Sequence, residues 1–78
     1  MINILEILKP IDWNDMESHK HKAVTLVDKR NGTKITEILQ SFEEVDGVRL
    51  VHVKDMCCSY MEIETYDCKY FDVFEEIK

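Results

Sequence analysis

Histidine and cysteine are the residue types in this chain that most readily bind a metal. His19 and His21 alternate in sequence, so on a strand both rings would lie on one face. His52 and the cysteines Cys57, Cys58 and Cys68 could complete a zinc site, but their spacing matches no standard zinc signature, and adjacent cysteines rarely ligate one ion. We therefore predict no metal and no cofactor, with a metal-binding regulator as an alternative.

Two arrangements could support catalysis. His52 precedes Cys57 closely enough to activate a thiol, but Asp55 and the acidic residues beyond it would raise the thiol pKa. Glu62 and Glu64 would lie about 6–7 Å apart on one strand face, a separation that overlaps the range used by glycoside hydrolases. A chain of 78 residues offers little room for a substrate cleft. We predict no catalytic residues, and the protein is expected not to be an enzyme.

The charge of the chain is concentrated at one end of the sequence. Residues 55–78 carry seven acids and two bases, a net charge of −5, whereas residues 1–54 carry nine acids and eight bases, a net charge of −1. Aromatic residues are interleaved with these acids. Such a surface suits a basic partner, because carboxylates accept paired hydrogen bonds from arginine and aromatic rings anchor interfaces. The predicted protein-binding residues are Tyr60, Glu62, Glu64, Tyr66, Asp67, Asp72 and Glu76.

One basic patch argues for a different partner. Five bases from Lys20 to Lys34 face the single acid Asp28 in sequence, which gives residues 18–34 a net charge of +4. The isoelectric point near 4.9 and the acidic end oppose binding to phosphate. No phosphate-binding loop or recognition-helix motif is present. We expect no direct nucleic-acid binding.

The length of the chain predicts a single domain, residues 1–78. No apolar run approaches the ~20 residues that span a bilayer. Met1–Leu8 is apolar but lacks a basic start and a small-residue cleavage site, so we interpret it as a short structural element and not as a signal peptide. A cytoplasmic protein without a membrane partner is expected, and the odd number of cysteines favours free thiols.

Four segments have the composition of strands. Ala23–Asp28 and Val48–Lys54 are rich in β-branched residues, and Ser59–Tyr66 alternates, with Met61 and Ile63 predicted to face the core. Lys69–Ile77 is a fourth strand or a terminal helix. The segment from Pro10 to Ser18 is a turn or a short helical segment.

The segment after Gly32 has two readings. Asn31-Gly32 lies between two apolar runs, which favours a hairpin. Ile35, Ile38, Leu39 and Phe42 nevertheless follow the spacing of one helix face, and Asp46-Gly47 could end such a helix. We predict a helix over about 34–46.

These elements predict an α+β domain. It would have an antiparallel or mixed sheet of three to four strands, one main helix packed on one face, and a short N-terminal element. The expected function is binding, and inhibiting or regulating, a larger protein with a basic surface, as a monomer or homodimer. In size and charge alone, such a protein is similar to the anti-restriction and anti-CRISPR proteins of viruses and mobile elements. The alternative from another class is an oligomeric small-ligand sensor or enzyme with a site between subunits.

Overall fold

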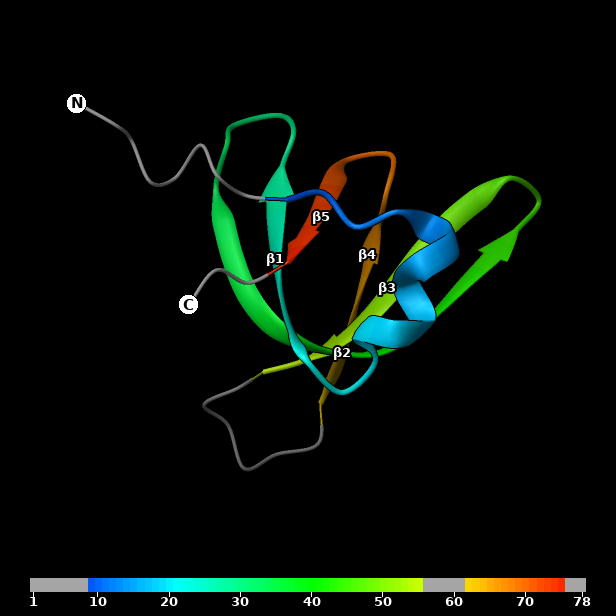
Figure 1. Cartoon of the computed structure of the whole chain (residues 1–78). Coiled ribbons are helices and arrows are strands. Elements are labelled where there is room, and N and C mark those ends of the chain that lie inside the picture. Colours follow the sequence, from blue (N-terminus) through cyan, green and yellow to red (C-terminus); the bar gives the residue numbers. More distant parts are fainter. Residues whose placement is uncertain (1–8, 56–61, 76–78) are drawn as a thin grey trace.

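The computed structural model describes residues 9–55 and 62–75, and these form a mostly β domain. Five strands make one antiparallel sheet, and a short 3-10 helix precedes them (Figure 1). The predicted α+β class with a main packed helix is therefore wrong. The elements are η2 (Trp13–His19), β1 (Ala23–Asp28), β2 (Lys34–Val45), β3 (Val48–Lys54), β4 (Ile63–Asp67) and β5 (Phe71–Glu75).

The segment predicted as a helix is the long strand β2, and a β-bulge explains its misleading pattern. The pairing of β2 with β3 shifts register between Leu39 and Ser41. A bulge adds one residue to a strand, so residues an odd number apart across it can face the same side. Leu39 and Phe42 thus both reach the core side, although a regular strand would separate them. The resulting spacing imitates one face of a helix.

Two tight turns fix the hairpins on either side of β2. Asp46 and Gly47 join Val45 to Val48 with φ angles of 52° and 80°. A two-residue turn with both φ angles positive matches the twist of antiparallel strands, and Asp-Gly is a favoured pair there. Asp46-Gly47 is therefore a hairpin turn and not the end of a helix. Between β1 and β2, Gly32 has a φ of 77° and donates a 2.7 Å hydrogen bond to the carbonyl of Asp28.

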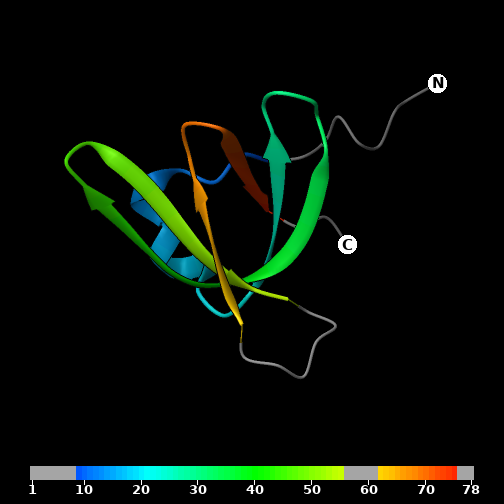
Figure 2. The same cartoon turned by 180° about the vertical axis from the view of Figure 1, so that it is seen from behind.

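The strand order requires the sheet to curl. The order is β4-β3-β2-β1-β5, so β4 and β5 lie at opposite edges although only Cys68–Tyr70 separates them in sequence. The edges of a flat five-stranded sheet would be about 19 Å apart. The four Cα steps from Asp67 to Phe71 span at most about 14 Å. The two edges therefore approach each other, and β4 and β5 lie near one another in both views (Figures 1 and 2).

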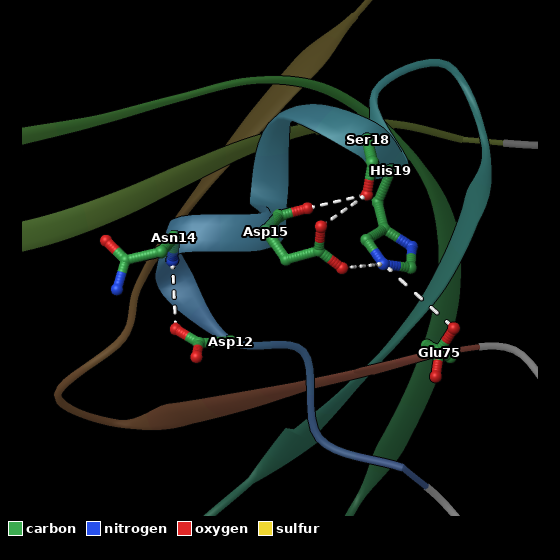
Figure 3. A network of polar contacts seen from close by, with 6 residues as sticks. All are labelled: Asp12, Asn14, Asp15, Ser18, His19 and Glu75. Carbon is green, nitrogen blue, oxygen red and sulfur yellow. Dashed lines mark hydrogen bonds and ion pairs between the residues drawn. The ribbon is translucent and has the colours of Figure 1, made fainter.

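The core fills the concave side of this curled sheet. Helix η2 contributes Met16, and the Trp13 ring packs edge-on against Phe42 with ring centroids 5.4 Å apart. Figure 3 shows the His19 ring between Asp15 of η2 and Glu75 of β5, with its Nε2 3.5 Å and 4.0 Å from their carboxylates. These contacts fix η2 over the sheet. The buried apolar residues are Met16, Val24, Leu26, Leu39, Val51, Val53 and Val73.

The segment before η2 covers the outer edge of β5. Ile11 donates a hydrogen bond to the carbonyl of Val73, and Glu75 donates one to the carbonyl of Lys9. Covering an edge in this way limits its pairing with other chains. The short N-terminal element predicted at Met1–Leu8 lies outside the described residues, and the expectation of a monomer or homodimer stays a prediction. No helix in the described part of the chain is long and apolar enough to cross a membrane.

Candidate functional site

Strand β4 faces the opposite way from the sequence prediction. Ile63, expected in the core, is 50% exposed. Glu64 lies in register with the buried Val53, and Tyr66 with the buried Val51, so both point to the concave side. The alternation was read correctly, but the side that carries tyrosine and glutamate faces inward. Met61, the other residue expected in the core, lies outside the described residues.

Tyr66 closes the gap between the two edges of the sheet. Its ring packs edge-on against Phe71 of β5, with centroids 4.7 Å apart, and its hydroxyl donates a 2.9 Å hydrogen bond to Glu64 Oε2. Burial, followed by the hydrogen bond to Glu64, raises the pKa of Tyr66 to about 12. Tyr66 therefore remains protonated at neutral pH and holds the Glu64 carboxylate in place.

Glu37 was missed by the sequence prediction. As part of a helix it would lie on the solvated side, but in β2 it lies between Ile35 and Leu39 on the core side. Its side chain is only 6% exposed, and its Oε2 has no hydrogen-bond partner. Burial raises the pKa of Glu37, and the charges of Glu64 and Asp55 raise it further. The signal for Glu37 was present as strand alternation before the bulge.

Four carboxylates gather where β2, β3 and β4 meet. Ile38 pairs with Lys54, and Lys54 with Ile63, and Glu37, Asp55 and Glu62 each adjoin one of these three residues in sequence. The charges of Glu64 and Asp55 act on Glu37. None of the ion pairs found among the described residues involves Glu37, Glu62 or Glu64. We call this region the acidic end; it consists of Glu37, Asp55, Glu62 and Glu64.

Two further predicted binding residues, Asp67 and Asp72, do not join the acidic end. Asp72 was expected beside β4, but β5 pairs with β1, and Asp72 lies 3.5 Å from Lys29 Nζ. Asp67 is at the far end of β4, where it accepts a hydrogen bond from the backbone of Lys69. Of the predicted set, the structure brings together Glu64 and Tyr66, and Glu62 directly precedes β4. Tyr60 and Glu76 lie outside the described residues.

A groove with a volume of about 630 Å³ lies at the opposite end of β4. Trp13, Cys68 and Phe71 supply apolar surface there. Its bases are largely matched by acids: Lys29 pairs with Asp72, and Arg49 lies 3.4 Å from Glu44. The groove therefore lacks the excess of one charge sign that distinguishes the acidic end.

The basic patch is also partly neutralised. Arg30 makes a bidentate contact with Asp28 at 2.9–3.0 Å and lies over the Tyr70 ring, 4.9 Å from its centroid. The hydrogen bond from Arg30 lowers the pKa of Asp28, so this carboxylate stays charged. Lys20 lies 3.5 Å from Glu17. Two acids outside residues 18–34, Glu17 and Asp72, thus balance two of the four excess positive charges, those of Lys20 and Lys29.

The histidines are separated by the fold. His19 ends η2 and His21 lies in the turn before β1 with a φ of 68°, so they do not share a strand face as predicted. His52 is on the outer face, where its ring contacts Thr65 at 2.8 Å and Glu43 at 2.6 Å. The described part of the chain contains no group of three His, Cys, Asp or Glu side chains that could hold a metal ion.

We expect the cysteines to be dispensable for folding. Burial raises the pKa of the Cys68 thiol, and Cys68 packs against the core, so its removal should cost about 1 kcal/mol. Cys57 and Cys58 lie outside the described residues. The variant with Cys57, Cys58 and Cys68 all replaced by alanine should still unfold cooperatively, with a modest loss of stability. Thermal unfolding measures the effect. One equivalent of zinc in wild-type protein purified without added metal would contradict the prediction.

Comparisons with protein-family models, with curated proteins and with solved structures each found no match. The geometry of the acidic end therefore carries the functional argument.

Proposed function

We propose that this domain is a non-enzymatic binding protein whose acidic end contacts a basic segment of a larger protein and inhibits or regulates it. The observation that carries this proposal is the set of carboxylates at Glu37, Glu62 and Glu64, which form no ion pair with any described base. Charge of one sign gathered on one surface speeds encounter with a partner of opposite charge and selects against partners of like charge.

Two further features support this surface. Glu62 and Glu64 are exposed, so they can meet a partner without unfolding of the strand. Exposed Ile63 lies between them in sequence, points to the outer face of the same edge strand and adds apolar area there. Interfaces combine apolar contact with charge-assisted hydrogen bonds, and β4 offers both.

The groove supports a second candidate function, a site for a small ligand. Its volume lies within the roughly 300–1,000 Å³ typical of ligand pockets, and Trp13 and Phe71 provide flat apolar surface. The measurement that separates the two candidates is thermal unfolding with a small-molecule library. Stabilisation that depends on Trp13 and not on the acidic end would favour the ligand site.

Neutralising the acidic end should abolish partner binding and leave the fold intact. The variant is Glu62→Gln with Glu64→Gln, and the matched control is Glu17→Gln with Asp46→Asn. The control removes the same charge from η2 and from the hairpin turn, where asparagine tolerates the positive φ of Asp46. Wild-type and control proteins should capture the same basic proteins from a lysate, and the acidic-end variant should not.

Salt dependence provides a further check. Capture by wild-type protein should weaken from about 50 mM to about 500 mM salt, because the screening length falls from roughly 14 to 4 Å. The lost affinity of the acidic-end variant should appear partly as slower association with the purified partner. If that variant retains full binding, the acidic end only keeps the protein soluble, and the proposal is wrong.

A further inference from the structure

Glu37 holds the one buried side-chain oxygen among the described residues that lacks a hydrogen-bond partner, its Oε2. Buried polar atoms in native proteins are nearly always satisfied, and an unsatisfied one calls for a physical explanation. Leaving a buried carboxylate without a partner destabilises the fold. An apolar residue would suit this position, because the neighbour of Glu37 across β1 is the fully buried Val24. The position therefore carries a group that weakens the free protein.

The surroundings of Glu37 add negative charge instead of compensating for it. The charges of Asp55 and Glu64 act on Glu37, and one oxygen of Glu64 already accepts the Tyr66 hydroxyl proton. Lys54 lies in the adjacent row of the sheet but points to the outer face, in register with Ile38 and exposed Ile63. A positive charge placed among these carboxylates would relieve their repulsion and satisfy the free oxygen.

The chemistry of the cation follows from the arrangement of the acceptors. The charges of Glu37 on β2 and Glu64 on β4 interact, and a guanidinium group presents five donors in a planar fork that can serve both carboxylates at once. It is also less strongly hydrated than an ammonium group, so it enters a buried position at lower cost. Glu37 Oε2 is shielded from solvent in the structure, so entry requires movement of neighbouring side chains, and exposed side chains change rotamer within nanoseconds.

We infer that the acidic end is a receptor for a single arginine side chain of the partner, with Glu37 Oε2 as the buried acceptor and Glu64 as an exposed acceptor beside it. This inference rests on the proposed function and names the group that is recognised. Glu37, which the helix prediction placed on a solvated surface, then contributes most to the affinity for the arginine side chain. The exposed Glu62 then contributes mainly to encounter.

The test uses a hexa-arginine peptide as the probe, with hexalysine and hexacitrulline as controls, on the full chain at low salt. Binding is measured by NMR titration. Glu37→Gln should weaken hexa-arginine binding roughly tenfold or more, because a charge-assisted hydrogen bond is lost. Asp46→Asn, with the same change in charge at an exposed turn, should change it by less than about twofold. The largest shifts should fall on Glu37, Glu64 and Tyr66.

Several outcomes would overturn the inference. Equal affinity for hexa-arginine and hexalysine would show that the site does not recognise the guanidinium group. An equal effect of Glu37→Gln and Asp46→Asn on binding would show that Glu37 is not a specific acceptor. If Glu37→Gln fails to fold, Glu64→Gln replaces it with the same expectation. Loss of binding in the Glu62/Glu64 variant but not in Glu37→Gln would leave the proposed function standing and reject the receptor. Failure of wild-type protein to bind either the peptide or any basic protein would reject both.

Discussion

Replacing Leu39 with alanine is expected to lower the free energy of unfolding by about 2–5 kcal/mol. Leu39 is fully buried, lies opposite Val53 in the sheet and belongs to the same core cluster as Met16 of η2. The backbone of Leu39 also joins β2 to the chain ahead of β1, because its N–H donates to Lys22 and its carbonyl accepts from His21. The cavity left by alanine cannot close without moving both strands.

This loss is large for a domain of this size. Proteins of 78 residues are typically stable by about 4–12 kcal/mol. Urea unfolding followed by circular dichroism measures the change. The control is Val45→Ala, since Val45 is 50% exposed near the hairpin turn and should change stability by less than about 0.5 kcal/mol. Similar effects at Leu39 and Val45 would mean that β2 does not carry the core.

Replacing Glu37 with glutamine is expected to stabilise the free protein by about 1–3 kcal/mol at neutral pH. The substitution keeps the shape of the side chain and removes a buried charge that faces Glu64 and Asp55. Each kcal/mol corresponds to a rise in melting temperature of about 4–8 °C for a domain of this length. If Glu37→Gln both stabilises the fold and weakens binding, the presence of a glutamate at this buried position is explained by binding and not by stability.

The pH dependence of this gain has a definite sign. The folded-state pKa of Glu37 is raised above its ordinary value of 4.5, so the folded protein binds the proton more tightly than the unfolded chain does. The contribution of Glu37 to wild-type stability is thus most favourable below pH 4.5 and falls as pH rises through the raised pKa. The advantage of the glutamine variant should be small near about pH 4 and grow towards about pH 8.

Chemical unfolding of both proteins across this range checks the prediction. Glu62→Gln serves as the control, because Glu62 is exposed and should alter stability by less than about 0.5 kcal/mol. A stability difference between wild type and Glu37→Gln that does not change with pH would contradict a raised pKa. A loss of stability in Glu37→Gln at neutral pH would show that Oε2 has a partner.

Much of the local structure could be predicted from the sequence. Ala23–Asp28 and Val48–Lys54 are strands with the predicted bounds, because β-branched residues between turn residues favour extended backbone wherever the chain folds. The segment after Pro10, predicted as a turn or a short helical segment, contains the short helix η2. The predicted alternation of side chains along β4 is also correct. Each of these features depends on neighbours in sequence.

What the sequence left open depended on contacts between distant residues. Ile35, Leu39 and Phe42 are four and then three residues apart, a spacing that fits a helix and a bulged strand equally well. Only the pairing of this segment with β1 and β3 selects the strand. The inward side of β4 and the contact of Asp72 with Lys29 follow from the strand order, in which β5 pairs with β1 and the sheet curls. Local periodicity determines which residues share a face, whereas burial of that face is decided by the strands that pack over it, and this is why Glu37 became visible only in the tertiary structure.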